Sequence, residues 1–192
     1  LLNNDVELKS NAISNLVKNS KKFNRKAIMG ALTVSFKDKK TIMKSGTSVK
    51  SWLLNITSHH FAGLNINKLK DIDPIRVDFL TGRCLLHPIE IFNKVRNYDA
   101  KNFPHYGADD EFSMRVKKFG YLTILCPTSV VFLKGYNKKN NYNKSLIFNL
   151  FNIKSSSNIV NKFKLSLSIV PIYAKLSFFI IGVLKSLYVF LR

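Results

Sequence analysis

The sequence has no acidic residue after Glu111, although the chain contains 11 aspartate and glutamate residues in total. Residues 112–192 carry 13 lysine or arginine residues, and the 192-residue chain has a formal net charge of +20. A purely cationic segment of this length argues against a cationic partner. It favours an anionic surface, such as nucleic acid or acidic lipid.

Cysteine is also scarce, because Cys84 and Cys126 are the only two in the chain. Both lie among apolar residues, and neither belongs to a CxxC pair. This pattern excludes a cysteine-based zinc site. We expect two buried free thiols in a reducing compartment rather than a disulfide.

Long apolar runs are missing, even in the strongly apolar segment 163–192. Its longest uninterrupted run, residues 176–184, is much shorter than the ~20 residues that a transmembrane helix needs. On a helical wheel its small and polar residues lie on one narrow face, which predicts a cationic, amphipathic segment on a membrane surface. A core helix packed on another part of the protein and a short tilted span are the alternatives. The face comprises Lys164, Ser168, Lys175, Gly182 and Ser186.

The first residues, LLNNDVEL, contain neither an initiator methionine nor the basic region of a signal peptide. A short apolar run followed by Asn-Asn-Asp is typical of a strand that ends in a loop. We therefore expect the chain to begin within a domain, as a fragment would.

Apolar spacing and turn residues predict an alternation of strands and helices along residues 1–133. The first helix should begin at Ser10 as its N-cap and present Ala12, Ile13, Leu16 and Val17 on one side. Such alternation predicts an α/β sheet flanked by helices. The expected elements are a helix over 10–23, a buried strand over 26–36, a hairpin partner at 41–46, an irregular stretch with short strands over 45–75, a strand over 75–80, helices over 87–95 and 108–119, two short strands around Pro127, and a helical stretch at 145–153.

The stretch HYGADDEFSMR places Asp109, Asp110 and Glu111 together in the first turn of a predicted helix. Phe112, Val116 and Phe119 should form its apolar face, with Gly120 ending the helix. Helix capping and a Glu111–Arg115 pair explain one or two of these acids. Three adjacent carboxylates repel one another unless a cation or substrate neutralises them, so the cluster predicts a general base or a metal site.

Two further stretches carry polar residues at predicted strand ends. Asn3 and Asp5 present oxygen atoms suited to Mg²⁺ or Mn²⁺, and Gly82 and Arg83 follow a strand where a phosphate or sugar oxygen could be held. By themselves, both stretches are also ordinary turn sequences. His59 and His60 have no partners at metal-ligand spacing, so we expect structural or surface roles for them.

Read in order, these stretches resemble the family 2 glycosyltransferases with the GT-A fold. The resemblance covers residues 1–133 and depends on NND, TGR and ADDE in the order and spacing of that family. It implies that Asp5 binds a divalent cation, Mg²⁺ or Mn²⁺, which holds a nucleotide-diphosphate sugar, and that Asn3 contacts the substrate. It also implies that Thr81, Gly82 and Arg83 form an acceptor-side loop.

The same resemblance implies that Asp109 is the base that deprotonates the acceptor hydroxyl, while Glu111 positions the substrate. His105 and Asp110 are counted among the expected substrate-binding residues. The sequence departs from the family at Ala108, where an acid is frequent, and at Leu133, where a metal-binding histidine often follows the late strand. The half of the family's domain that grips the nucleotide base has no counterpart in residues 1–192.

The resemblance implies an inverting glycosyltransferase that modifies a glycan or a lipid-linked acceptor, peripheral to the cytoplasmic face of a membrane. The expected organisation is a catalytic part at 1–133, a basic Asn-, Lys- and Ser-rich connector at 134–162, and an amphipathic membrane-associating tail at 163–192. The alternatives are a cationic module that binds nucleic acid or another anionic surface, and an inactive glycosyltransferase remnant. No nucleic acid is expected as a partner in the first interpretation.

Overall fold

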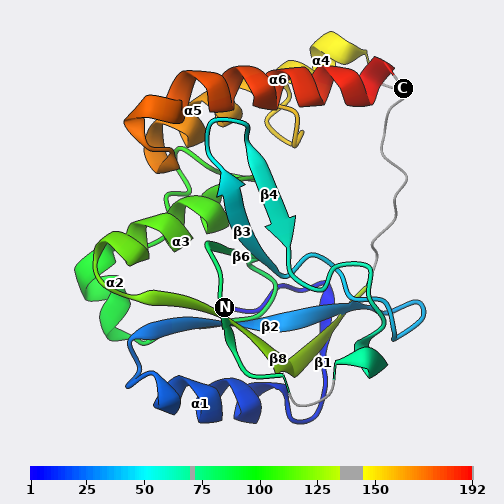
Figure 1. Ribbon diagram of the computed structural model, residues 1–192, viewed down its shortest axis with the longest axis vertical. Coiled ribbons are helices and arrows are strands. Elements are labelled where there is room, and N and C mark those ends of the chain that lie inside the picture. The colour runs from blue at the N-terminus through cyan, green and yellow to red at the C-terminus, as the bar shows by residue number, and fades with distance from the viewer. Residues whose placement is uncertain (70–71, 135–144, 192) are drawn as a thin grey trace. The chain divides into compact units, whose positions relative to one another are not determined.

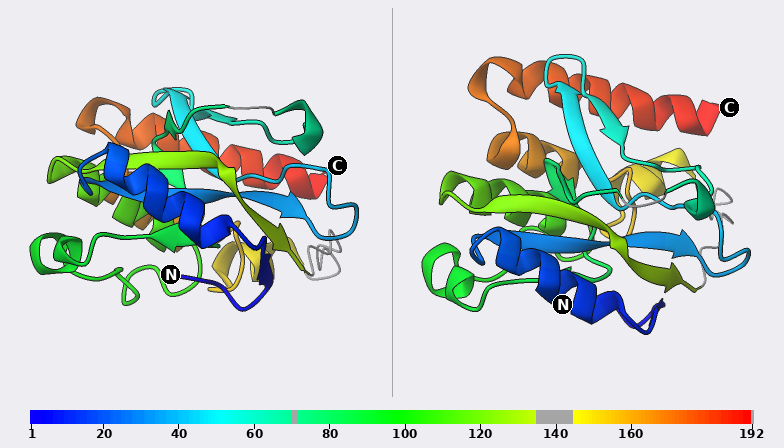
Figure 2. Two further views of the ribbon diagram at one scale, coloured as in Figure 1. Left: turned by 90° about the horizontal axis from the view of Figure 1, so that it is seen from below. Right: turned by 60° about the horizontal axis from the view of Figure 1, so that its bottom comes forward.

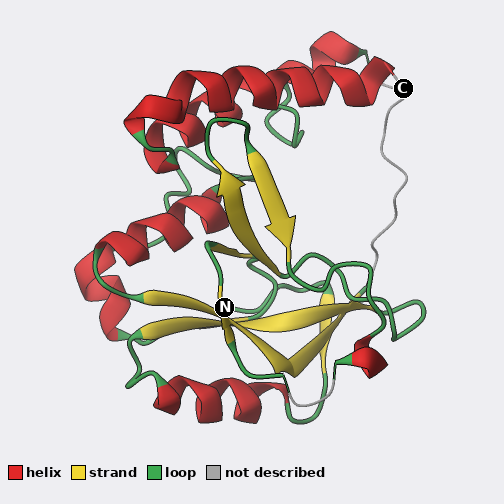
Figure 3. Ribbon diagram, viewed as in Figure 1, coloured by secondary structure: helices red, strands yellow, loops and turns green. Residues whose placement is uncertain are grey.

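The structure is a computed structural model that describes residues 1–69, 72–134 and 145–191. In this part of the chain, eight strands interspersed with helices extend as far as β8, and helices follow it (Figures 1 and 3). The strands are β1 (Val6–Leu8), β2 (Ala27–Ser35), β3 (Gly46–Ser51), β4 (Ile56–His59), β5 (Ile75–Arg76), β6 (Phe79–Leu80), β7 (Leu85–Leu86) and β8 (Leu122–Leu133). The helices are α1 (Ala12–Lys22), α2 (Glu90–Val95), α3 (Ala108–Lys118), α4 (Leu146–Phe151), α5 (Ile159–Ile169) and α6 (Lys175–Leu191), with 3-10 turns η1 (Ile66–Lys68) and η2 (Ile172–Ala174).

The chain divides into two compact units that are each discontinuous in sequence. Among the described residues, the first unit holds residues 1–48, 58–97 and 113–134. The second holds residues 49–57, 98–112 and 145–191. The units are defined by contacts in space and not by function. They therefore do not test the three functional segments expected from the sequence, which stay a prediction. Residues 135–144 of the expected connector lie outside the described residues.

A mixed sheet forms the centre of the first unit. Its strand order is β1-β8-β2-β7, and β5 pairs with β8 as well. β2 and β8 run parallel, whereas β7 is antiparallel to β2, and both β1 and β5 are antiparallel to β8. Every residue of β2 from Ala27 to Val34 is buried, as expected for a strand covered on both faces. The predicted α/β class is confirmed.

β8 is one continuous strand, so the prediction of two short strands around Pro127 was wrong. The strand bulges instead: Ala31 pairs with Cys126, but its neighbour Leu32 pairs with Val130. Proline has no N–H to give to the ladder, and a bulge accommodates it without ending the strand.

Helix α1 packs against β2 and β8 and supplies hydrogen bonds to the bulge (Figure 2). The Asn15 side-chain amide donates to the carbonyl oxygen of Thr128 at 2.6 Å, and the Ser129 hydroxyl donates to the carbonyl of Ala12 at 2.8 Å. Buried backbone groups without partners are costly, so these bonds help to place the helix. Because α1 docks there, Ala12 and Leu16 are buried in the core, together with Met29 of β2.

Two details of the predicted α1 were wrong. The N-cap residue is Asn11 rather than Ser10, and its side chain makes no capping hydrogen bond. Ile13 and Val17 were expected on the packed side, but they are 55% and 40% exposed. Both follow core residues by one position, which rotates them about 100° away from the sheet.

The predicted strand over 75–80 is two strands that join different sheets. β5 pairs with β8, whereas β6 pairs with β3 in the sheet β4-β3-β6. The expected hairpin partner of β2 is reduced to a single bridge between Val34 and Ile42. The irregular stretch with short strands over 45–75 is confirmed in the residues described.

His59 and His60 have structural hydrogen bonds, as expected. His59 Nδ1 lies 2.9 Å from the Thr47 hydroxyl, and His60 Nε2 lies 2.8 Å from the Ser48 hydroxyl. Burial lowers the pKa of His59, as does the positive charge of Lys44. Both cysteines are buried free thiols, as predicted, and burial raises the pKa of Cys126 to about 12.

Helix α3 ends before Gly120, whose φ of +80° is the left-handed conformation that commonly terminates a helix. Phe112 and Val116 are buried as predicted. Phe119 was expected on the same apolar face, but it lies after the last helical residue and is 54% exposed. Because the helix has already ended, Phe119 does not follow the helical periodicity that buries Phe112 and Val116.

In the second unit, α5 and α6 pack on each other, and α6 packs on the tip of the hairpin formed by β3 and β4. The rings of Trp52 and Phe178 lie 5.8 Å apart between centroids, and the Asn55 amide donates to the carbonyl of Phe178 at 3.2 Å. Lys185 donates to the carbonyl of Asn55. None of the helices in the described part of the chain is long and apolar enough to span a bilayer.

The C-terminal segment breaks into two helices at Pro171, so a single helical wheel does not describe it. On α6 the small face is the buried one: Gly182 is buried, and Ser186 is only 7% exposed. The opposite side of α6 bears an exposed apolar stripe at intervals of four residues. This outward stripe comprises Leu176, Ile180, Leu184 and Tyr188.

Candidate functional site

The structure brings the NND and TGR stretches together in the first unit. The backbone N–H of Asn3 donates to the carbonyl oxygen of Arg83 at 3.0 Å. Leu2 forms an antiparallel bridge with Cys84, and Leu1 exchanges backbone hydrogen bonds of 2.9 Å with Leu85. This short ladder places the two predicted substrate-binding stretches side by side.

The TGR loop is braced by residues that precede β3. Both the backbone N–H and the hydroxyl of Thr81 donate to the carbonyl oxygen of Ser45, at 3.0 and 3.2 Å. The guanidinium of Arg83 donates to the carbonyl of Lys44 at 2.7 Å. Ser45 is itself buried, and its hydroxyl accepts a hydrogen bond of 2.8 Å from the backbone N–H of Thr33 in β2. The loop is therefore fixed to the central sheet.

Asn3 and Asp5 lie on an exposed turn just before β1. The Asp5 carbonyl accepts a 2.7 Å hydrogen bond from the backbone of Lys134, which ties the turn to the end of β8. The neighbouring carboxylate of Glu7 pairs with Lys134 at 2.9 Å, and this hydrogen bond lowers the pKa of Glu7. Asp5 is thus the carboxylate of this turn that a cation would use.

Among the residues described, no group of three or more His, Cys, Asp and Glu side chains is close enough to hold a metal ion. Mg²⁺ is often bound by only one or two protein carboxylates, with substrate phosphates and water completing its ligands. The hard oxygen atoms of Asp5 and Asn3 fit that kind of site. They do not fit a metal held by protein ligands alone.

The acidic cluster lies in the second unit, in the first turn of α3. Gly107, with a φ of +90°, turns the preceding loop into the helix, and its carbonyl accepts a 2.8 Å hydrogen bond from the N–H of Glu111. Asp109, Asp110 and Glu111 are all partly buried. The positive end of the helix dipole stabilises negative charge at this position.

The three acids do not have equal chemistry. Burial, and then the negative charge of Asp109, raise the pKa of Asp110 to about 7. Asp110 therefore titrates near neutral pH. Sequence reasoning did not predict the raised pKa of Asp110, because it arises from the protein atoms that surround the carboxyl group.

The predicted site residues are divided between the two units. Asn3, Asp5 and the TGR loop belong to the first unit, and the structure brings them together. His105 and the acidic cluster belong to the second unit, where they precede and begin the same helix.

His105 also lines a cavity of about 230 Å³ in the second unit. The loop before α3, the end of α4 and the start of α5 form this cavity, which we call the α4–α5 cavity. Lys101 and Lys164 are among its lining residues, and sequence reasoning missed both of them. The full lining comprises Lys101, Asn102, Pro104, His105, Tyr106, Phe151, Ile153, Asn158, Val160, Asn161 and Lys164.

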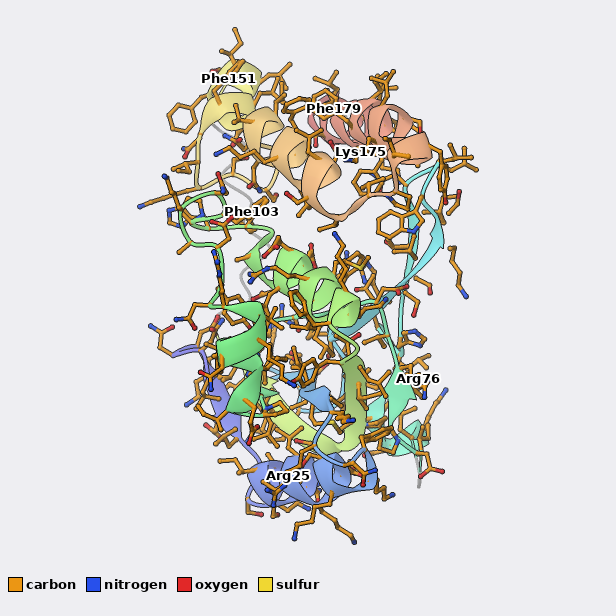
Figure 4. The ribbon with its side chains drawn as sticks, turned by 90° about the vertical axis from the view of Figure 1, so that its left-hand side faces the viewer. Arg25, Arg76, Phe103, Phe151, Lys175 and Phe179 are labelled. Atoms are coloured by element: carbon orange, nitrogen blue, oxygen red, sulfur yellow. The ribbon has the colours of Figure 1, made fainter. Side chains whose placement is uncertain are left out.

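A larger cavity, of about 450 Å³, lies in the first unit at the start of β8. Lys117 of α3 forms a half-buried ion pair with Asp78 on its wall, and Tyr121 and Arg76 line it as well. Arg76 is labelled on β5 in Figure 4. The two half-buried charges on this wall, Lys117 and Asp78, neutralise each other. This cavity therefore offers a ligand less unneutralised charge than the α4–α5 cavity does.

Neither a comparison with protein-family models nor a search of curated proteins gives a match for this chain.

Proposed function

We propose that this chain carries the acceptor-side part of an inverting, metal-dependent glycosyltransferase with a GT-A-like fold. The enzyme would move a sugar from a nucleotide-diphosphate donor to a hydroxyl of a glycan or glycolipid, at the cytoplasmic face of a membrane. The observation that carries this proposal is the ladder that joins Asn3 to Arg83. It joins the hard-oxygen turn, which would take the donor's cation, to the cationic acceptor-side loop.

The chemistry assigned to the residues is a single displacement. The Asp109 carboxylate accepts the proton of the acceptor hydroxyl, whose oxygen forms a bond to the anomeric carbon of the sugar. The bond between that carbon and the diphosphate breaks, and the electron pair leaves with the diphosphate oxygen. Arg83, in the acceptor-side loop, would hold a phosphate or sugar oxygen of the substrate. With its pKa raised to about 7, Asp110 is partly protonated at neutral pH, and in that form it can donate a hydrogen bond to the substrate.

Asp5 and Asn3 are the residues that would hold the divalent cation. When bound, the cation would neutralise the diphosphate and make it a better leaving group. The turn that presents these two residues is anchored on one side by Arg83 and on the other by Lys134. That anchoring would keep the oxygen ligands in place before substrate arrives.

Attachment to a membrane is supported by the outward stripe of α6. Soluble proteins rarely expose a contiguous apolar surface of this kind without a partner. Residues 145–191 contain lysines and no acid, so the surface complements an anionic bilayer. Lys175, at the start of α6, and Phe179 are labelled in Figure 4. An apolar helix face flanked by lysines is the pattern of helices that lie in the membrane interface.

The test is turnover of sugar nucleotides by the protein that carries this chain. Activity should be lost in Asp109→Asn and retained in a matched Asp99→Asn variant, whose carboxylate accepts hydrogen bonds from Asn102 in its own loop. An Asp109→Asn protein that turns over as fast as the unmodified protein would remove the assigned base.

The competing function is a cationic module that binds nucleic acid. The exposed apolar stripe favours lipid, because nucleic-acid surfaces offer phosphates rather than an apolar phase. Flotation with anionic liposomes, set beside a gel shift with random DNA, separates the two. Binding to DNA without flotation would favour the nucleic-acid module.

A further inference from the structure

We propose that the α4–α5 cavity binds the phosphate-bearing headgroup of an amphiphile. The cavity lies wholly within the second unit, and its lining joins cationic and apolar side chains. Its interpretation as the place where an acceptor is held rests on the transferase function proposed above. The binding itself does not depend on that function.

The cationic side of the cavity consists of Lys101 and Lys164. Neither lysine forms an ion pair with any residue that the structure describes. Asp99, the acid in the same loop, does not line the cavity, and its carboxylate accepts hydrogen bonds of 3.0 and 2.7 Å from Asn102. Two lysines facing one cavity without a lining acid favour an anionic ligand with several oxygen atoms.

The cavity walls are fixed by hydrogen bonds that leave the lysines available. The Asn158 side chain accepts a 2.7 Å hydrogen bond from the N–H of Asn161 and begins helix α5. The amide of Asn161 donates to the carbonyl of Tyr106 at 2.9 Å. These bonds join α5 to the loop that carries His105, so the cavity is formed without a ligand.

The rim of the cavity is apolar and exposed. Phe151, Ile153 and Val160 all line it and are at least half exposed to solvent. Figure 4 shows Phe151 on α4. The cavity volume of about 230 Å³ is below the ~300–1,000 Å³ of sites that enclose a whole drug-sized ligand. It therefore suits a headgroup, with the hydrocarbon chain leaving along these three side chains.

The cavity is close to the proposed base along the chain. His105 and Asp109 are separated by four residue steps, and an extended chain spans at most ~3.3–3.6 Å per residue, so their Cα atoms lie within about 14 Å. Gly107 lies between them in a turn that is closely packed. A Cβ atom at this position would lie 3.2 Å from Phe103 and 3.3 Å from Leu165 of α5. An amphiphile whose phosphate occupies the cavity would thus present nearby sugar hydroxyls to Asp109.

The experiment is calorimetric titration of the full chain with three probes: octyl phosphate, octanol and inorganic phosphate. Octyl phosphate should bind at least about tenfold more tightly than either of the others, which corresponds to about 1.4 kcal/mol. Inorganic phosphate that binds as tightly as octyl phosphate would show a site for the free anion. Octanol that binds as tightly would show a site for the hydrocarbon chain alone. Either result would overturn the proposal.

A variant pair then locates the site. Lys101→Gln/Lys164→Gln should weaken octyl phosphate binding at least about tenfold, because each charge-assisted hydrogen bond is roughly twice as strong as a neutral one. The matched control is Lys9→Gln/Lys118→Gln, which removes the same charge from exposed lysines that do not line the cavity, and it should change the affinity less than about twofold.

Folding of each variant is checked by circular dichroism. If the double variant is unfolded, Lys101→Gln alone decides, because Lys101 is exposed and its loss leaves packing intact. Unchanged affinity in a folded variant would overturn the proposal.

The outcome is separable from the transferase test. An Asp109→Asn protein should lose turnover and keep octyl phosphate binding, since no step of the titration needs a donor. Loss of binding in the lysine variants with turnover unchanged would overturn the assignment of the cavity as an acceptor site.

Discussion

The backbone N–H of Asn3 donates a 3.0 Å hydrogen bond to the carbonyl oxygen of Arg83. The two residues are far apart in the sequence, yet this bond joins an acidic turn to a cationic loop. Asp5 lies on that turn, and the guanidinium of Arg83 is held by the carbonyl of Lys44. In the proposed enzyme, this turn would hold the donor's cation next to the loop that carries Arg83.

Asp5→Asn should raise the metal concentration needed for half-maximal turnover. Loss of a carboxylate ligand weakens binding of a hard cation, and we expect a change of at least about tenfold, comparable with other perturbations of metal sites. Titration of Mg²⁺ or Mn²⁺ into EDTA-treated protein measures it. Glu7→Gln is the matched control, because Glu7 is engaged with Lys134 and should leave the metal dependence unchanged. Equal effects of the two variants would contradict the assignment.

The pKa of Asp110, raised to about 7 chiefly by burial and then by Asp109, makes stability depend on pH. The unfolded carboxyl titrates near its ordinary pKa of about 3.9, so the folded protein binds the extra proton between about pH 4 and pH 7. The contribution of Asp110 to the free energy of unfolding should therefore be greatest below pH 4, and it should be lost as the pH rises through 7.

Asp110→Asn should remove this pH-dependent loss of stability. Above pH 7 the variant should be more stable than the unmodified protein, by about 1–2 kcal/mol once partial solvent screening is allowed for. Urea unfolding at pH 4, 6 and 8 measures the difference. Glu111→Gln is the control, and a stability difference for Asp110→Asn that does not grow with pH would exclude the buried, protonated state.

Charging the apolar stripe of α6 should release the protein from anionic vesicles. Leu176→Asp/Ile180→Asp/Leu184→Asp replaces three exposed apolar side chains, each worth about 1.5–3 kcal/mol if fully buried, with charges that the bilayer repels. Vesicle binding measured by flotation should fall at least about tenfold. Ile13→Asp/Val17→Asp changes exposed apolar residues of α1 and should leave binding unchanged. Equal loss in both proteins would mean that the stripe has no special role.

Ser45→Ala should destabilise the protein by about 1–3 kcal/mol, because it leaves the buried N–H of Thr33 without its acceptor. The melting temperature should fall by about 2–4 °C for each kcal/mol in a chain of this size. Ser10→Ala is the control: Ser10 is exposed and lies before the N-cap Asn11, so its loss should be neutral. Thermal unfolding of both variants checks the prediction, and an equal melting temperature for Ser45→Ala would contradict the role of this hydroxyl.

Much of the local structure could be predicted because it depends on short-range spacing. The buried strand β2, helix α3 with Gly120 at its end, and the two buried thiols all follow from apolar periodicity and turn residues. The candidate residues Asn3, Asp5, Arg83 and Asp109 were also identified from their types and positions. Their roles stay predictions, because a residue type shows what chemistry is available but not whether it is used.

Two of the errors occurred where a distant partner decides the local structure. By local rules Pro127 should end a strand. Here the side chain of Asn15 in α1 donates a hydrogen bond to the bulge, and the Ser129 hydroxyl donates one to the carbonyl of Ala12. The chain therefore bulges at Pro127, and β8 continues. Val77 and Asp78 interrupt an apparently regular strand because β5 and β6 pair with different partners.

The sequence by itself determined the α/β class, the charge asymmetry and the set of candidate residues, since composition and spacing are sufficient for these. Only the tertiary structure decided that Asn3 meets Arg83, that the pKa of Asp110 is raised by burial, and that α6 turns Ser186 inward and Leu176 outward. The reason is the same in each case. Pairing, desolvation and exposure depend on what surrounds a residue in space, and spacing along the chain does not encode those surroundings.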